Sequence, residues 1–260
     1  MTQPLAGRVA LVTGGGRGIG RATVLELARL GAAVALVARS APELEEAAAA
    51  VRAQGGRALA LAVDVGDTAA TAGTVERIAA ELGPVDVLIN NAGILGPLGP
   101  TATSDPAHWS QTIAVNLVGA YAYLRATLPG MLERGWGRIV NVSSGAAQGS
   151  GVHNLSAYSA SKAGMDMLTR AVAVEIADSG VTVNSVYPGI VETAMQVALR
   201  ATPEEQLGTR SSSFFRGIHE RGELIEPEDS ARLIGAMVLS DLQGQVIRIG
   251  DDQASALMQR

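Results

Sequence analysis

A tyrosine and a lysine stand four residues apart in the segment SAYSASKAG, at Tyr158 and Lys162. In a helix this spacing projects both side chains from one face. A phenol, with an unperturbed pKa of about 10, is a poor acid–base group at neutral pH until a nearby ammonium stabilises its phenolate. The pair is therefore typical of proton transfer, although the same spacing also occurs as an ordinary pair on a helix surface.

A glycine-rich turn, TGGGRGIG at residues 13–20, leads directly into an Ala/Leu-rich segment. Glycines between a strand and a helix let the backbone approach a pyrophosphate, and the helix N-terminus supplies free N–H groups and a positive dipole. The spacing of Gly14, Gly18 and Gly20 differs from the usual G-x-G-x-x-G fingerprint, so an ordinary tight turn is the alternative. The strand–turn–helix context favours a phosphate-binding site.

Arg39 directly follows the apolar run VALVA at residues 34–38. At this place the dinucleotide fingerprint has a carboxylate for the adenosine ribose. A guanidinium can pair with a 2′-phosphate that a carboxylate would repel. Arg17, in the glycine loop, is a second cation for the same phosphate. These charges predict NADP(H) as the cofactor, with NAD(H) as the less favoured alternative. In the alternative interpretation both arginines are simply solvated. Independently of the cofactor, Ser40 and Glu43 are expected to form a capping box for the next helix.

Seven short, almost uniformly apolar runs alternate with longer Ala/Leu/Glu-rich segments. Such runs are typical of strands that helices cover on both faces. The expected fold is α/β: a doubly wound, seven-stranded parallel sheet of Rossmann type, in three layers, formed by one domain over residues 1–260. The expected strands are residues 8–13, 33–38, 57–64, 85–90, 138–144, 181–188 and 245–250.

Residues 191–226 do not fit this alternation. Their centre, GTRSSSFFRGIHERGE, is rich in Ser and Gly and contains the pair Phe214 and Phe215. This composition predicts a mobile substrate lid within the domain rather than a scaffold helix.

Composition argues against several other classes of function. A net charge of −5 and a pI near 5.3 indicate no excess of positive charge that would bind the phosphates of nucleic acid. The chain has no cysteine, and its three histidines are scattered, so no metal site is expected. Neither a signal-like start nor a run of membrane-spanning length is apparent, which predicts a cytoplasmic protein without a membrane partner.

Several motifs, in order along nearly the whole chain, resemble those of the short-chain dehydrogenase/reductase family, of the classical type. They are the glycine loop, NNAG at residues 90–93, NVSS at 141–144, YSASK at 158–162 and YPGIVET at 187–193. The resemblance implies an oxidoreductase that interconverts a ketone or aldehyde and an alcohol by hydride transfer, with reduction as the favoured direction. A non-catalytic, cofactor-binding scaffold is the alternative.

By this resemblance Tyr158 would be the catalytic acid–base residue, and Lys162 would lower its pKa and bind the nicotinamide ribose. Ser144 would hold the substrate oxygen, with Ser143 as a lesser candidate. Asn116 would support a water-linked proton relay, unless it is simply a satisfied buried amide. The implied cofactor-binding set is Gly14, Gly16, Arg17, Gly18, Ile19, Gly20, Arg39, Asp64, Val65, Asn91, Ala92, Gly93, Tyr158, Lys162, Pro188, Gly189, Val191 and Thr193.

The expected partners are a small carbonyl or alcohol substrate and further copies of the chain. The family resemblance implies a homodimer or homotetramer built on long helices. The apolar segment AGMDMLTRAVAVEIA, residues 163–177, could supply that face, but core packing explains it equally well. Asn90 and Asn91 are expected to tie strands and loops together at least as much as they contact ligand.

Overall fold

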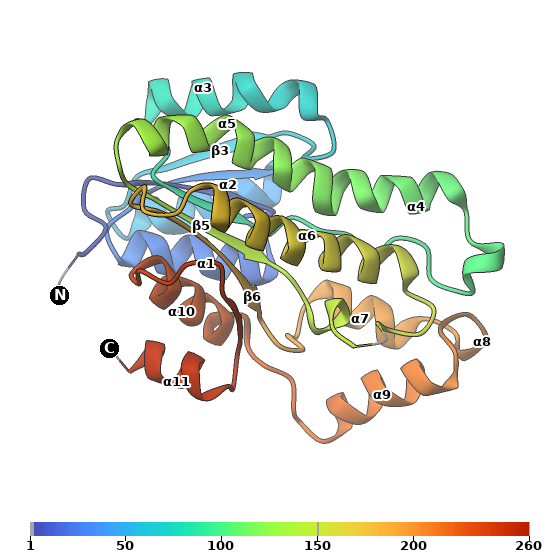
Figure 1. Cartoon of the computed structure of the whole chain (residues 1–260). Coiled ribbons are helices and arrows are strands. Elements are labelled where there is room, and N and C mark those ends of the chain that lie inside the picture. Colours follow the sequence, from blue (N-terminus) through green and yellow to red (C-terminus); the bar gives the residue numbers. More distant parts are fainter. Residues whose placement is uncertain (1–2, 150, 260) are drawn as a thin grey trace.

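Seven parallel strands form a sheet in the order β3-β2-β1-β4-β5-β6-β7 (Figure 1). The computed structural model describes residues 3–149 and 151–259. The strand order reverses between β1 and β4, which confirms the predicted doubly wound, Rossmann-type sheet. The strands are β1 Val9–Thr13, β2 Ala33–Ala38, β3 Ala58–Ala62, β4 Val87–Asn90, β5 Gly137–Val142, β6 Val181–Tyr187 and β7 Val246–Arg248.

Helices connect the strands and cover the sheet on both faces (Figure 1). None of the helices in the described ranges is long and apolar enough to cross a membrane. The α-helices are α1 Gly18–Arg29, α2 Ala41–Ala53, α3 Thr71–Glu81, α4 Pro106–Ile113, α5 Gly119–Glu133, α6 Ser156–Glu175, α7 Ala194–Ala201, α8 Glu204–Leu207, α9 Thr209–Glu220, α10 Pro227–Val238 and α11 Asp252–Met258. Short turns are η1 Thr68–Ala70, η2 Thr101–Thr103 and η4 Gly145–Ala147, and η3 Ala114–Val118 is a π-helix.

Consecutive strand residues face opposite helical layers. In β1, Val12 belongs to a buried cluster with Leu27 of α1 and Leu233 of α10. Its neighbour Leu11 belongs to a second cluster, which contains Tyr123 of α5. Because both faces of the sheet are buried, the strands need apolar residues at almost every position, and the uniform runs in the sequence follow from this.

A chain of buried polar side chains crosses the second half of the sheet. Asn90 of β4 donates to Asn141 of β5 over 2.9 Å, and Asn141 donates to Thr169 of α6 over 2.8 Å. Thr169 and Ser185 of β6 lie 2.8 Å apart, oxygen to oxygen. Each of the four residues is at most 2% exposed. The prediction that Asn90 ties strands together agrees with this geometry.

Residues 191–226 contain three helices, which their Ser- and Gly-rich composition did not indicate, and their role as a substrate lid stays a prediction. A bridge between Val191 and Ile225 closes the base of this segment, and α7, α8 and α9 lie beyond it (orange in Figure 1). The helices bury Leu199, Leu207 and Phe215 in a cluster that also contains Leu155, the residue before α6. That burial stabilises short helices whose local composition is unfavourable.

The capping box predicted at the start of α2 does not form. Ser40 is the N-cap residue, as expected, but its side chain makes no capping hydrogen bond. Glu43 turns instead toward the glycine loop, where its Oε1 lies 3.5 Å from Nη1 of Arg17. The charge of Arg17 therefore competes successfully for the carboxylate that a capping box would use.

Candidate active site

A cavity of about 1120 Å³ opens at the carboxyl ends of the strands, around the point where the strand order reverses. This is where ligands bind in open α/β sheets. Every residue of the predicted cofactor-binding set lines the cavity, and so does Ser144. Asn116 is the one predicted site residue that does not line it.

The glycine loop forms the floor of the cavity beside β1. Gly14 and Gly18 have φ values of +66° and +52°, which glycine adopts without strain. The N–H of Gly14 donates to the Val37 carbonyl over 2.7 Å. No side chain caps the N-terminus of α1, so its free N–H groups and dipole are available to a phosphate.

Gly20 packs so closely that a side chain does not fit. A Cβ atom there would lie 2.0 Å from the Gly14 carbonyl oxygen and 2.5 Å from Nδ2 of Asn91. We expect Gly20→Ala to lower the free energy of unfolding by about 2 kcal/mol or more and the melting temperature by roughly 5 °C. Gly73→Ala in α3 is the control and should be neutral or slightly stabilising, because the added Cβ would meet no described atom outside its own helical turn within 4 Å. Equal melting curves for the two variants would contradict this packing.

Asn91 fastens the loop after β4 to the glycine loop. Its Nδ2 donates to the carbonyls of Thr13 and Gly14, over 2.9 and 3.2 Å. Thr13 Oγ1 in turn accepts from the backbone N–H groups of Asn91 and Ala92, over 3.0 and 3.1 Å. Asn91 thus combines a structural tie with a place on the cavity wall, and Thr13 is a supporting residue that the sequence did not reveal.

Two cations lie where the adenosine end of a dinucleotide would be. Arg17 is exposed and shares its charge with Glu43. Arg39 follows β2, is exposed and lines the cavity. Within residues 3–149 and 151–259, no carboxylate lies within ion-pair distance of Arg39. Its guanidinium is therefore available to an anionic ligand.

Tyr158 and Lys162 occupy the first turns of α6, with the Nζ atom of Lys162 5.8 Å from the centre of the Tyr158 ring. Lys162 is 3% exposed, and its Nζ donates to the Val142 carbonyl over 2.7 Å. Burial lowers the pKa of Lys162 to about 8, against an opposing effect of Asp166. Burial also raises the pKa of Tyr158, which a hydrogen bond with Ser144 opposes.

The two adjacent serines differ in what their hydroxyl groups contact. Ser143 is 2% exposed, and its Oγ donates to the Lys162 carbonyl over 3.3 Å. Ser144 begins η4, where its Oγ accepts from the N–H of Ala146 over 3.2 Å, and it also contacts Tyr158. An Oγ that accepts from the backbone keeps its proton for another acceptor, which favours Ser144 as the donor to a substrate oxygen.

Asn116 lies in the π-helix η3 and is fully buried. Its Oδ1 accepts from the N–H of Ile94 over 2.8 Å, and its Nδ2 donates to the Ile94 carbonyl and to Ser161 Oγ, over 2.9 and 3.0 Å. Ser161 continues the connection, because its hydroxyl donates to the Tyr158 carbonyl over 2.8 Å. The side chain is thus a buried amide with hydrogen-bond partners that joins the loop after β4 to α6, and its part in a water-linked proton relay stays a prediction.

The far end of the cavity is apolar. Leu155, Leu199, Leu207 and Phe215 form a buried cluster against which the Tyr158 ring packs. Residues of α7 and α9 close this end together with the loop after β4; those that line the cavity are Leu95, Ala194, Met195, Gln196, Leu199, Phe214 and Phe215. A ligand group beside Tyr158 would therefore meet mainly hydrocarbon.

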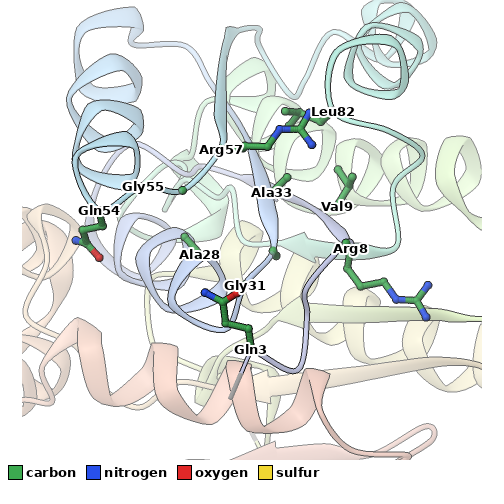
Figure 2. Close-up of a pocket in the computed structure, with 13 residues that line it drawn as sticks. Gln3, Arg8, Val9, Ala28, Gly31, Ala33, Gln54, Gly55, Arg57 and Leu82 are labelled. Carbon is green, nitrogen blue, oxygen red and sulfur yellow. The ribbon is translucent and has the colours of Figure 1, made fainter. Parts of the chain in front are cut away.

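A smaller pocket, of about 260 Å³, lies at the amino-terminal ends of β1 and β2 (Figure 2). Arg8 and Arg57 line it, but both guanidinium groups already have partners. Arg8 pairs with Asp86 over 3.3 Å and lies 3.8 Å from the centre of the Trp136 ring, and Arg57 donates to the Glu81 carbonyl over 3.1 Å. We assign this pocket no ligand.

Comparison with known proteins identifies the family. The short chain dehydrogenase model matches residues 8–204, so the chain belongs to the short-chain dehydrogenase family and is an NAD(P)-dependent oxidoreductase acting on CH–OH groups. It is 40% identical over 249 residues to cis-4-hydroxycyclohexanecarboxylate dehydrogenase from Sinomonas cyclohexanicum, covering 95% of each chain.

Solved structures with bound cofactor are similar over almost the full length. An NAD⁺-bound xylitol dehydrogenase aligns with a TM-score of 0.85 at 29% identity, covering 94% of this chain and 98% of the other. A metagenomic short-chain oxidoreductase in complex with NADP aligns with a TM-score of 0.77 at 33% identity, covering 94% and 98%. The relatives thus include proteins with either cofactor.

Proposed function

We propose that this protein is an NADP(H)-dependent reductase of a compact, apolar ketone. The observation that carries the proposal is Arg39, an exposed guanidinium that follows β2 on the wall of the cofactor cavity and has no carboxylate partner among the described residues. A carboxylate at this place would favour NAD(H), whereas a cation favours the 2′-phosphate. Glu43 partly neutralises the positive charge of Arg17, so we expect Arg39 to account for most of the preference for NADP(H).

The residues of the cavity fit the cofactor. The glycine loop leaves room for a pyrophosphate against the uncapped N-terminus of α1. Pro188, Gly189 and Thr193, after β6, line the part of the cavity where the nicotinamide would lie, and Asp64 and Val65, after β3, line the part that would receive the adenine. When bound, the nicotinamide supplies hydride to the substrate carbon.

Tyr158 and Ser144 then act on the substrate oxygen. Ser144 donates a hydrogen bond to the charge that develops on this oxygen, and Tyr158 transfers its phenolic proton to it. Lys162, held by the Val142 carbonyl, would stabilise the resulting phenolate and hold the nicotinamide ribose. In alcohol oxidation the same groups act in reverse, with the Tyr158 phenolate as the base.

The apolar end of the cavity supports an alicyclic or similarly apolar substrate. Leucine, methionine and phenylalanine side chains from α7 and α9 surround the space beside Tyr158. The relative from S. cyclohexanicum is named for a substituted cyclohexane alcohol. Residues 191–226, in which these helices lie, serve as the substrate lid of a single 260-residue domain.

The decisive experiment assays several carbonyl compounds with both cofactors. Cyclohexanone, acetoacetyl-CoA and a ketose should be compared with NADPH and with NADH as reductant. We expect the cyclic ketone with NADPH to give the highest kcat/KM, by about tenfold or more over the sugar, because the pocket offers few groups that could pair with several hydroxyls. A higher kcat/KM with NADH would reject the cofactor assignment, and preference for the ketose would reject the substrate class.

Exposed apolar side chains on α6 support a homo-oligomer. Met167 and Val174 are 60% and 80% exposed, and Tyr121 of the neighbouring α5 is 47% exposed. We expect Val174→Glu to reduce the molar mass in solution, measured by light scattering, because it places a charge in the buried core of the interface. Val197→Glu, at an exposed site on α7, is the control and should leave the mass unchanged. A monomeric wild-type protein would overturn the assignment.

A further inference from the structure

A buried acidic residue, Asp166, shares one face of α6 with Tyr158 and Lys162. The three residues follow one another at intervals of four, so each lies one helical turn from the next. Asp166 is 4% exposed, and Lys162 is 3% exposed. Carboxylates are seldom buried to this degree unless a cation or several hydrogen-bond donors compensate for the lost water.

The two carboxylate oxygens of Asp166 have different surroundings. Oδ2 accepts a hydrogen bond from the hydroxyl of Tyr187, at the end of β6. Oδ1 is buried and has no hydrogen-bond partner in the part of the chain that the structure describes. One donor compensates only partly for the burial of a charged carboxylate, so a positive charge in the same buried region would stabilise it.

Lys162 is a buried cation one helical turn from Asp166, and it acts on the carboxylate at longer range than a direct ion pair, because no such pair forms within the described ranges. The negative charge of Asp166 raises the pKa of Lys162, against the larger lowering that burial causes. Two other cations, Arg170 of α6 and Arg248 of β7, lower the pKa of Tyr187. Burial and Asp166 itself have the larger effect and raise the pKa of Tyr187, so Tyr187 remains a phenol that donates to Asp166.

We propose that Asp166 is a positioning residue for the reaction, whose buried carboxylate keeps the Lys162 ammonium charged. Its hydrogen bond with Tyr187 connects this carboxylate to Pro188 and Gly189, the turn that follows β6 on the cavity wall. The catalytic meaning of this pairing rests on the proposed function, because Lys162 must be cationic to stabilise the phenolate of Tyr158. The pairing itself can be measured without substrate or cofactor.

Lys162 is the only lysine in the 260-residue chain. Protein labelled with ¹³C at the lysine ε-carbon therefore gives one lysine signal, whose chemical shift against pH reports the pKa of Lys162 directly. We expect Asp166→Asn, which keeps a hydrogen-bond acceptor and removes the charge, to lower this pKa by about one unit. At pH 7 the charged fraction of Lys162 would then fall from roughly nine-tenths to about half.

Tyr187→Phe is the matched control, because it removes the hydrogen bond and keeps the carboxylate. Its Lys162 should titrate at or slightly above the wild-type pKa, whereas a purely structural role of Asp166 would move both variants in the same direction. Should Asp166→Asn fold poorly, the double variant Asp166→Leu/Tyr187→Phe removes both polar partners together and should show the same downward shift. Coincident titration of the wild-type protein and the charge-removing variant would overturn the proposal. Turnover retained in Tyr158→Phe would instead reject the proposed function and leave this titration valid.

Discussion

Replacement of Tyr158 by phenylalanine is expected to lower kcat for ketone reduction by about a thousandfold. The substitution removes one hydroxyl group from a ring that packs against the apolar end of the cavity. Without it, no group in our proposed mechanism passes a proton to the developing alkoxide, and loss of a positioned acid typically costs between about a hundredfold and ten-thousandfold in rate. The rate is measured as loss of NADPH absorbance with cyclohexanone as substrate.

Cofactor binding separates this loss from a general disruption of the site. The dissociation constant for NADPH, measured by calorimetry, should change by less than about threefold in Tyr158→Phe, because the ring and Lys162 remain in place. Tyr121→Phe, at an exposed position on α5, is the matched control and should retain full activity. A Tyr158→Phe enzyme with near wild-type kcat would show that another group donates the proton.

Arg39→Asp should reverse the preference between the two cofactors. Loss of the guanidinium removes a charge-assisted contact with the 2′-phosphate, and the new carboxylate repels that phosphate while it can accept from a ribose hydroxyl. We expect KM for NADPH to rise by about a hundredfold, equivalent to roughly 2.7 kcal/mol, and KM for NADH to fall. Initial rates with varied concentrations of each cofactor provide the measurement.

Two further substitutions test whether the effect belongs to this position. Arg77→Asp makes the same change of charge on α3, where Arg77 pairs with Glu81, and should leave both KM values unchanged. Glu43→Gln releases Arg17 from its carboxylate partner and should lower KM for NADPH modestly. If Arg39→Asp and Arg77→Asp have the same effect, net charge rather than local pairing governs the preference.

The sheet and most of the cavity could be predicted because their signals are local and their geometry is general. Apolar runs buried on both faces identify parallel strands, and the carboxyl ends of such strands meet at one edge. The glycine loop and Arg39 each follow a strand, so they had to meet there. Their closeness in space could therefore be predicted without knowing the structure of the loops between them.

The failures share a different cause, which is competition from residues distant in sequence. Ser40 and Glu43 match a capping box, but Arg17 takes the carboxylate across the cavity rim. The helices of residues 191–226 depend on packing against the rest of the chain. Asp166 could not be interpreted either, because its partner Tyr187 lies on another element. Local sequence patterns do not contain these long-range contacts.

The buried amide and hydroxyl chain through Asn90, Asn141, Thr169 and Ser185 gives the central strands a single permitted alignment. Strands that are apolar on both faces could slide by two residues and still bury every side chain on its former face, at little hydrophobic cost. Such a slide would leave buried amide groups without hydrogen-bond partners, and each unpaired group costs about 1–3 kcal/mol. These hydrogen bonds therefore favour one alignment of β4, β5 and β6, and Asn141 belongs to the strand that leads to Ser144.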